Sequence, residues 1–324
     1  MNIFDFRRSP VMGDVLKYEK KRILGRGTFG EAWLVVSKVS RRSYVMKEMK
    51  TGTWAQKEKD QSENEVNILA MCNHINIVKY VGGYRMHKNL PNEKILIIME
   101  YADHGDLSAV IKRQRDVYKQ FIPEPQVLNW LIQICFGLQF IHKKNILHRD
   151  LKTQNIFLTS QNLIKIGDFG ISKSLNNTLD LAHTAIGTPH YLSPEICKRE
   201  PYGNKSDMWS LGCVLYELCT LKLAFPAENF LQLVQSICRG SYEPISKKFY
   251  SSKVSDLIQV LLRPAPERRP SVEQVLSASK LQTEVQTYLS YVNRLKMNEE
   301  SSKEQRERAS SHSSKVIFIS NQVW

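Results

Sequence analysis

The segment from His148 to Asn155, with the sequence HRDLKTQN, places several chemically active side chains close together in the chain. A reaction that transfers a phosphoryl group needs an acceptor for the hydroxyl proton, cations beside the phosphates and ligands for a metal ion. Asp150 can accept the proton, Lys152 can neutralise the γ-phosphate, and Asn155 can ligate Mg²⁺, which prefers oxygen donors. A match at so many fixed positions rarely arises by chance. The segment therefore predicts transfer of a phosphoryl group from ATP to a hydroxyl.

A second acid, Asp168, lies in the sequence GDFG, which follows a short apolar strand. An Asp-x-Gly sequence taken alone is typical of an ordinary turn. Its position shortly after the HRDLKTQN segment instead favours a ligand for the principal Mg²⁺ that bridges the phosphates. Phe169, the next residue, is bulky and apolar and is suited to packing beneath the helix that carries Glu65.

Gly25, Gly27 and Gly30 form the pattern G-x-G-x-x-G. Dinucleotide-binding folds share this pattern, but in those folds a helix follows the glycines. Here the residues 31–36 predict a strand instead. A strand–loop–strand hairpin lets backbone N–H groups approach the phosphates of ATP, while a glycine-rich hairpin without a ligand stays an alternative.

Lys47 ends another predicted strand, from which it can reach the α- and β-phosphates if an acid holds it in place. The helix predicted over 56–72 offers three acids that could hold it, namely Glu58, Glu63 and Glu65. Glu65 is the preferred partner because Val66, beside it, marks the buried face of the helix. A solvated surface charge is the alternative for any one of the three.

The stretch between Gly170 and Ser193 is polar and rich in Ser and Thr, which makes it a candidate for phosphorylation. A phosphate adds about −1.5 to −2 charges and can be bound by basic side chains. Arg149 and Lys173 are placed to bind one.

Elsewhere the pattern predicts an α+β protein. Short strands at 18–24, 31–37, 43–48, 77–84 and 95–101 surround the helix at 56–72, and mainly helical patterns follow residue 104. We expect a flank at 1–17, a domain at 18–278 with a small N-lobe (18–100) and a larger C-lobe (104–278), and a C-terminal segment at 279–324. That segment begins with a helix and continues as a basic, Ser-rich tail that we expect to be partly disordered.

The composition excludes several classes of protein. The net charge of +14 is spread along the chain, and no zinc-finger, RNP or basic-zipper pattern accompanies it, so we expect no direct nucleic-acid binding. The cysteines form no CxxC pair, which argues against a structural zinc site. No stretch is long and apolar enough for a membrane span, so we expect no membrane association.

Together these motifs resemble the eukaryotic protein kinases over roughly 18–278. The resemblance implies a bilobal fold, with a small β-rich N-lobe that holds one regulatory helix and a larger α-helical C-lobe. It is supported by the later sequence DMWSLG, which begins at Asp207, and by a P-E motif that ends at Glu195. In such kinases Asp207 would brace the catalytic loop and Arg269 would pair with Glu195.

Shorter matches narrow the resemblance to the NIMA-related kinases. They are FGEA at 29–32, KTQNIF at 152–157, AIGTP at 185–189 and LYELCTLK at 215–222. This likeness implies serine/threonine specificity, which Lys152 also favours. It further implies a role in cell-cycle, microtubule or cilium regulation. The implied location is cytoplasmic, including the centrosome, basal body or cilium, with the nucleus as an alternative.

The same resemblance implies the binding site for ATP and Mg²⁺, with Mn²⁺ as an alternative metal. Adenine would lie between Leu24, Val45 and Phe157, beside the gatekeeper Met99 and against the backbone of Glu100 and Ala102. The full set of ATP-binding residues would be Leu24, Gly25, Arg26, Gly27, Thr28, Phe29, Gly30, Glu31, Ala32, Val45, Lys47, Met99, Glu100, Ala102 and Phe157.

By the same resemblance, Thr184 aligns with the usual activating phosphosite. Three residues depart from the family pattern: Val45 and Ser193 stand where Ala is usual, and His190 stands where Tyr is usual.

Alternatives stay open at two points. An inactive scaffold and a tyrosine kinase are rival interpretations of the domain, although the presence of Lys47, Asp150, Asn155 and Asp168 argues against the scaffold. The heptad-like seam from Leu281 to Leu295 could form a weak dimer, but it spans only about two heptads. We therefore expect a monomer with this helix folded onto the large lobe, acting on protein substrates with Ser or Thr acceptors.

Overall fold

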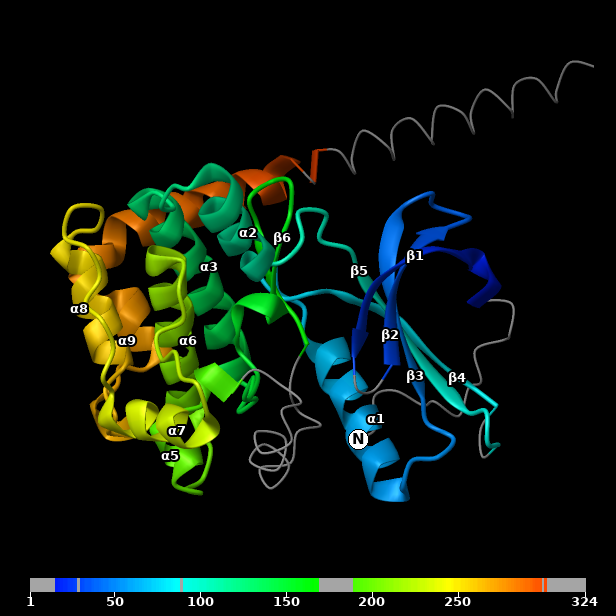
Figure 1. Cartoon of the computed structure of the whole chain (residues 1–324). Coiled ribbons are helices and arrows are strands. Elements are labelled where there is room, and N and C mark those ends of the chain that lie inside the picture. Colours follow the sequence, from blue (N-terminus) through cyan, green and yellow to red (C-terminus); the bar gives the residue numbers. More distant parts are fainter. Residues whose placement is uncertain (1–14, 28–29, 88–89, 169–188, 299, 302–324) are drawn as a thin grey trace, which may run out of the picture. The chain divides into compact units, whose positions relative to one another are not determined.

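The computed structural model describes residues 15–27, 30–87, 90–168, 189–298 and 300–301. The chain divides into two compact units, Met1–Val275 and Leu276–Trp324. The first unit contains an N-lobe built on a sheet and a C-lobe built from helices (Figure 1). The fold is therefore α+β and bilobal, as the sequence predicts.

The N-lobe sheet has five antiparallel strands in the order β1-β2-β3-β5-β4. Helix α1 packs against this sheet at β4 (Figure 1). A short 3₁₀ turn, Val15–Lys17, precedes the first strand. The elements are β1 (Tyr18–Gly27), β2 (Gly30–Ser37), β3 (Ser43–Lys50), α1 (Gln56–Met71), β4 (Tyr80–Met86) and β5 (Lys94–Glu100).

Alternation along the strands gives the sheet two different faces. One face carries a buried cluster of Val35, Met46, Leu96 and Ile98, with aromatic side chains packed against it. Successive side chains of a strand point to opposite faces. Lys47 therefore shares the other face with Val45 and with Met99, which lies opposite Val45 on β5.

The C-lobe is organised around two long helices that are buried along most of their length. Its core includes Trp209, whose ring stacks on Phe225 with centroids 5.4 Å apart. The helices are α2 (Leu107–Arg113), a π-helical turn (Gln114–Tyr118), α3 (Glu124–His142), α5 (Pro194–Cys197), α6 (Asn204–Thr220), α7 (Phe230–Arg239), α8 (Ser252–Leu261) and α9 (Val272–Ser277). Short 3₁₀ turns lie at Thr153–Asn155, Pro189–Tyr191 and Pro266–Arg268.

A two-stranded sheet, β6 (Ile156–Leu158) and β7 (Ile164–Ile166), links the two lobes. The backbone of Ile166 bonds to that of Asn76 and Val78, at 2.8 Å in both cases. This pairing explains a difference from the sequence prediction. The strand predicted over 77–84 begins only at Tyr80, because the backbone before it is engaged with β7.

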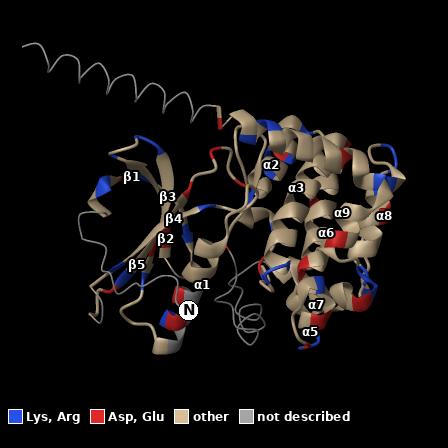
Figure 2. Ribbon diagram, turned by 180° about the vertical axis from the view of Figure 1, so that it is seen from behind, with Lys and Arg blue, Asp and Glu red and all other residues tan. Residues whose placement is uncertain are grey.

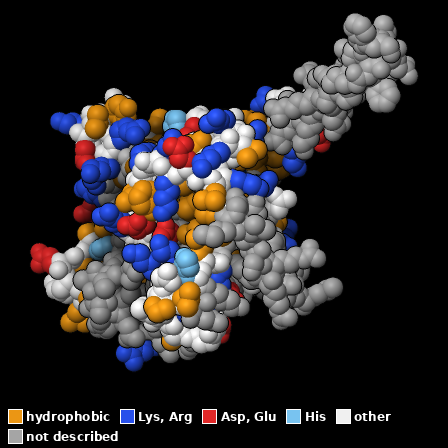
Figure 3. All heavy atoms as spheres, turned by 90° about the vertical axis from the view of Figure 1, so that its right-hand side faces the viewer, with side chains coloured by type: hydrophobic (Ala, Val, Ile, Leu, Met, Phe, Trp, Pro, Cys, Tyr) orange, Lys and Arg blue, Asp and Glu red, His pale blue; other side chains and the backbone are white. Residues whose placement is uncertain are grey.

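Basic side chains are distributed over both lobes and are mixed with acidic ones (Figure 2). The face turned to the viewer in Figure 3 likewise shows Lys and Arg side chains interspersed with apolar and a few acidic ones. Among the described residues, no helix has the length and apolar character that crossing a membrane requires.

The second unit contains a 3₁₀ turn, Ser279–Leu281, and a helix over 282–298. Leu281, Val285, Tyr288 and Val292 of the predicted seam are buried. The helix predicted for this segment is thus present. Whether the chain is a monomer or dimerises through this helix stays a prediction.

Candidate active site

His148 is fully buried and fixes the start of the HRDLKTQN segment. The backbone N–H of Asp150 donates to His148 Nδ1 at 3.3 Å, so the ring proton lies on Nε2 and is donated to the carbonyl of Gly167 at 3.1 Å. Burial lowers the pKa of His148 and so favours this neutral form. The imidazole therefore connects the segment to the residue immediately before Asp168.

The carboxylate of Asp150 is held by the two polar residues predicted to act with it. Asn155 Nδ2 donates to Asp150 Oδ2 at 2.9 Å and to the Asp150 carbonyl at 2.8 Å. Lys152 Nζ lies 2.9 Å from the same carboxylate oxygen. The structure thus brings Asp150, Lys152 and Asn155 into one cluster, and the Asp150 side chain keeps 21% of its surface exposed to solvent.

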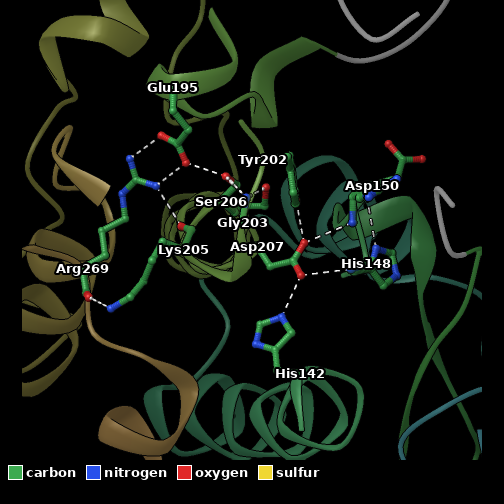
Figure 4. A network of polar contacts seen from close by, with 12 residues as sticks. His142, His148, Asp150, Glu195, Tyr202, Gly203, Lys205, Ser206, Asp207 and Arg269 are labelled. Atoms are coloured by element: carbon green, nitrogen blue, oxygen red, sulfur yellow. Dashed lines mark hydrogen bonds and ion pairs between the residues drawn. The ribbon is translucent and has the colours of Figure 1, made fainter. Parts of the chain in front are cut away.

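Asp207, at the start of α6, lies beside this segment and braces it (Figure 4). Its carboxylate accepts the backbone N–H groups of His148 at 3.0 Å and of Arg149 at 3.1 Å. It also accepts His142 Nε2 at 2.7 Å and the Tyr202 hydroxyl at 2.5 Å. Burial alone would raise the pKa of Asp207, but these donors, His142 first among them, lower it below its ordinary value. The predicted bracing role of Asp207 is confirmed.

Two residues of the site have left-handed backbone conformations that non-glycine residues rarely adopt. The φ angles are +65° at Arg149 and +48° at Asp168. Such conformations persist where surrounding contacts determine them, and they gather at functional sites. At Arg149 the contact is the hydrogen bond from its backbone N–H to Asp207.

Lys47 and Asp168 form an ion pair between the N-lobe and the loop that follows β7. Lys47 Nζ lies 3.1 Å from Asp168 Oδ1. The charge of Lys47 is the main reason that the pKa of Asp168 is lowered, and it outweighs the opposing effect of desolvation. A cation from β3 and a candidate metal ligand are therefore adjacent.

Replacing Lys47 by Met is expected to raise the pKa of the Asp168 carboxyl. The lowered pKa in the folded protein means that this ion pair stabilises the fold at neutral pH. Its contribution is lost as the pH falls through the lowered pKa of Asp168. Carbon-13 NMR titration of the Asp carboxyls would measure the change. Lys165→Met is the control, because Lys165 pairs with Glu100 at 2.9 Å instead. An unchanged Asp168 pKa in Lys47→Met would contradict the assignment.

The glycine-rich segment forms a hairpin, as predicted. Gly27 at the end of β1 pairs with Gly30 at the start of β2. Gly30 has φ +153°, and a Cβ there would lie 1.9 Å from the carbonyl oxygen of Glu48, so no other residue fits without a shift of the backbone. Because a strand follows the glycines, the arrangement differs from that of dinucleotide-binding folds. Thr28 and Phe29, which lie between Gly27 and Gly30 in the sequence, are outside the described residues.

The remaining candidate ATP residues lie on the strands around Lys47 and on the chain that leaves β5. Leu24, Gly25 and Arg26 belong to β1, Glu31 and Ala32 to β2, Val45 to β3, Met99 and Glu100 to β5, and Phe157 to β6. Ala32 lies opposite Lys47, and Ala102 is buried just beyond β5. Glu100 is anchored by the backbone N–H of Lys79 at 2.7 Å and by Lys165.

The partner predicted for Lys47 cannot be assigned from the described contacts. Glu65 lies on α1 as predicted, but its side chain and that of Glu58 lie outside the described residues. Glu63 pairs with Arg85 Nη1 at 2.5 Å and is thereby engaged elsewhere. Lys173 and Thr184 also lie outside the described residues.

Glu195 and Arg269 form the pair that the sequence predicts (Figure 4). Both Nη atoms of Arg269 donate to the Glu195 carboxylate at 2.8 Å, and Ser206 donates to it at 2.6 Å. Arg269 also lies over the ring of Trp209, 5.0 Å from its centroid. This buried pair fixes the P-E motif against α6.

Several residues of the site were not found by sequence reasoning. His142 and Tyr202 both donate to Asp207, and Tyr191 and Thr153 donate to the buried carboxylate of Glu217. Burial raises the pKa of Glu217, and these hydrogen bonds offset only part of that shift. His142 is the last residue of α3 and Tyr202 precedes α6, so no local pattern connects them. The contacts form only in the folded chain.

The family model of the protein kinase domain matches residues 18–279. The chain belongs to the protein kinase family. Curated relatives place this kinase in the NIMA-related branch. It is similar to serine/threonine-protein kinase Nek5 of Homo sapiens, with 44% identity over 274 residues, which cover 84% of this chain and 37% of that protein. It is also similar to Nek1 of Mus musculus, with 44% identity over 85% of this chain and 22% of that protein.

A shorter relative is covered more completely by this kinase. Serine/threonine-protein kinase nekl-2 of Caenorhabditis elegans is 42% identical over 267 residues, which cover 80% of this chain and 73% of that protein. For Nek1 and Nek5 the chain spans less than half of their length.

Proposed function

We propose that this chain is an ATP-dependent protein kinase that transfers the γ-phosphoryl group to Ser and Thr hydroxyls of protein substrates. The observation that carries the proposal is the Lys47–Asp168 ion pair, which joins residues 121 positions apart beside the Asp150–Lys152–Asn155 cluster. The three relatives described above are all serine/threonine-protein kinases, which supports the choice of acceptor.

In this proposal Asp150 orients the attacking hydroxyl and accepts its proton. Its carboxylate is partly exposed. Oδ2 contacts both Lys152 and Asn155, and these two contacts fix the orientation of the second carboxylate oxygen. Lys152, adjacent to it, is placed to neutralise charge on the transferred group. The rigid bracing by His148 and Asp207 keeps these groups aligned before a substrate binds.

The residues present fit a magnesium ion. Asn155 donates its Nδ2 to Asp150, so its amide oxygen is directed away from that residue. This oxygen and the ionised carboxylate of Asp168 are donors of the kind that Mg²⁺ prefers. When bound, the metal would neutralise negative charge on the phosphates. Mn²⁺ would use the same donors.

ATP is proposed to lie between the β1–β2 hairpin and β6. Lys47 would bind its phosphates, the hairpin backbone would cover them, and Leu24, Val45 and Phe157 would enclose the adenine. Lys47, Val45 and Met99 share one face of the sheet, and this arrangement supports the proposal. The test is phosphate transfer from labelled ATP to a generic protein substrate, followed by phosphoamino-acid analysis. Mainly phosphotyrosine, or no transfer above background, would overturn the proposal.

Activation by phosphorylation is part of the proposal. Thr184→Ala is expected to lower kcat by about tenfold or more, because Arg149 would lose its phosphate partner. The measurement compares the variant with fully phosphorylated wild type, and Thr178→Ala is the matched control in the same stretch. Equal kcat values for Thr184→Ala and wild type would contradict the proposed activation by phosphorylation.

The proposed partners are protein substrates, and the chain is proposed to act as a monomer. The alternative, a weak dimer through 281–295, would appear as a dimer in sedimentation equilibrium. A cytoplasmic location and a role in the cell cycle, microtubules or cilia are proposed from the family alone. Localisation of a tagged chain would test them.

A further inference from the structure

A buried acid lies outside the proposed active site. Glu93 belongs to the loop between β4 and β5, yet its side chain is 0% exposed. Its carboxylate accepts Lys59 Nζ at 2.7 Å and Arg85 Nε. Loop carboxylates are usually solvated, and a buried one requires cations and hydrogen bonds to remain charged. The opposite charges of Lys59 and Arg85 lower the pKa of Glu93 despite the opposing effect of burial.

Arg85 extends this contact to a second acid. Its Nε atom donates to Glu93, and its Nη1 atom lies 2.5 Å from Glu63. Lys59 and Glu63 are four residues apart on α1 and therefore lie on the same side of the helix. We call Lys59, Glu63, Arg85 and Glu93 the α1 clamp. It joins one side of the helix to β4 and to the β4–β5 loop.

The backbone of the connection that precedes α1 also contacts this loop. Thr51 N–H donates to the carbonyl of Glu93 at 2.9 Å. A Cβ on Gly52 would lie 1.9 Å from the carbonyl oxygen of Pro91, so only glycine permits this approach. The connection from β3 to α1 and the β4–β5 loop are thus held against each other.

Apolar packing cannot position the first half of α1 by itself. Residues 56–65 read QKEKDQSENE and contain no apolar side chain, whereas Val66 and Leu69 in the second half are buried. Charged contacts with good geometry specify orientation where apolar burial is scarce. Ser62, which is buried against Met49 of β3, is one contact of this half, and the clamp adds charged contacts where the helix has no apolar side chain of its own.

We propose that Arg85 and Glu93 are positioning residues for phosphoryl transfer, because they fix the helix that carries Glu65. The inference rests on the proposed function and deepens it. Displacement of α1 would move the acid proposed for Lys47 and would misalign the phosphates, without touching the residues proposed for adenine. Loss of the clamp should therefore lower kcat more than it weakens nucleotide binding.

The test compares Glu93→Gln and Arg85→Met with a matched control, Glu48→Gln. Glu48 also accepts two cations in the N-lobe, Lys20 and Lys94, but these lie on β1 and β5. Hydrogen exchange over 56–71, kcat and the affinity for a fluorescent ATP analogue are measured for each full-length variant. We expect faster exchange and about tenfold lower kcat in the clamp variants, with nucleotide affinity within about twofold of wild type.

Hydrogen exchange separates failure of this inference from failure of the proposed function. If wild type transfers no phosphate, the proposed function fails, and exchange in α1 still decides whether the clamp positions the helix. Exchange in Glu93→Gln that matches Glu48→Gln would overturn the inference, as would an active wild type with unchanged kcat in both clamp variants. Non-additive effects in the double variant Arg85→Met/Glu93→Gln would support a single unit.

Discussion

Replacing Asp150 by Asn is expected to lower the phosphorylation rate by about 10³-fold, while nucleotide affinity stays within about twofold of wild type. The amide has almost the same shape and still accepts the hydrogen bond from Asn155. It cannot take up the hydroxyl proton, and it removes the negative charge that Lys152 faces at 2.9 Å. The loss should therefore appear in kcat.

The measurement is transfer from labelled ATP under saturating substrate, with affinity for a fluorescent nucleotide as the second readout. Asp116→Asn is the matched control, because that side chain is 45% exposed and pairs only with its neighbour Arg115 among the contacts described. A kcat for Asp150→Asn close to that of Asp116→Asn would remove Asp150 from the proposed role. Loss of nucleotide binding as well would point to misfolding of the segment.

Replacing Arg269 by Met is expected to lower the free energy of unfolding by about 3–5 kcal/mol at neutral pH. Arg269 is fully buried, and its loss leaves the Glu195 carboxylate without its cation. It also leaves the carbonyls of Arg263, Lys205 and Pro264 without this donor. A buried polar group that loses its partner destabilises the fold by its full desolvation free energy.

Urea unfolding would measure this change, with Lys21→Met as the control. Lys21 pairs with Glu19 on the surface at 2.6 Å, and removal of such an exposed pair changes the free energy of unfolding little. The pKa of Glu195 is lowered in the wild type: burial raises it, but Arg269 and Ser206 more than offset that effect. The wild-type contribution is therefore present at neutral pH and is lost on acidification. The penalty of Arg269→Met should shrink as Glu195 protonates, and an equal penalty at all pH values would contradict this account.

The sequence predicted the elements well where the pattern is local. The alternation of β3 places Val45 and Lys47 on one face, and helices follow residue 104 as the pattern predicts. The pairings of Glu195 with Arg269 and of Asp207 with the HRD backbone were also predicted, from the order of motifs in the family. The strand and helix patterns follow from residue types at local spacing, whereas the two pairings were implied only by the resemblance to the family.

Most contacts between segments that are distant in the sequence could not be predicted from local patterns. His142, Tyr202 and Glu217 look like ordinary polar residues of helices and loops, and their roles depend on burial that only the fold creates. The first residues of the strand predicted at 77–84 pair instead with Ile166 of β7. The periodicity of the sequence does not show which of the two sheets this backbone joins. Glu93 lies in the loop before β5, and its burial depends on contacts with Lys59 and Arg85 that strand or helix periodicity does not reveal.

The bracing of the HRD backbone by Asp207 has a consequence for the order of folding. The acceptor for the N–H groups of His148 and Arg149 lies 59 and 58 residues later in the chain. Contacts of such high sequence separation form late, because a long loop must close first. During synthesis the HRDLKTQN segment leaves the ribosome well before its brace. We therefore expect the HRDLKTQN segment to reach its final backbone geometry only after α6 has packed into place.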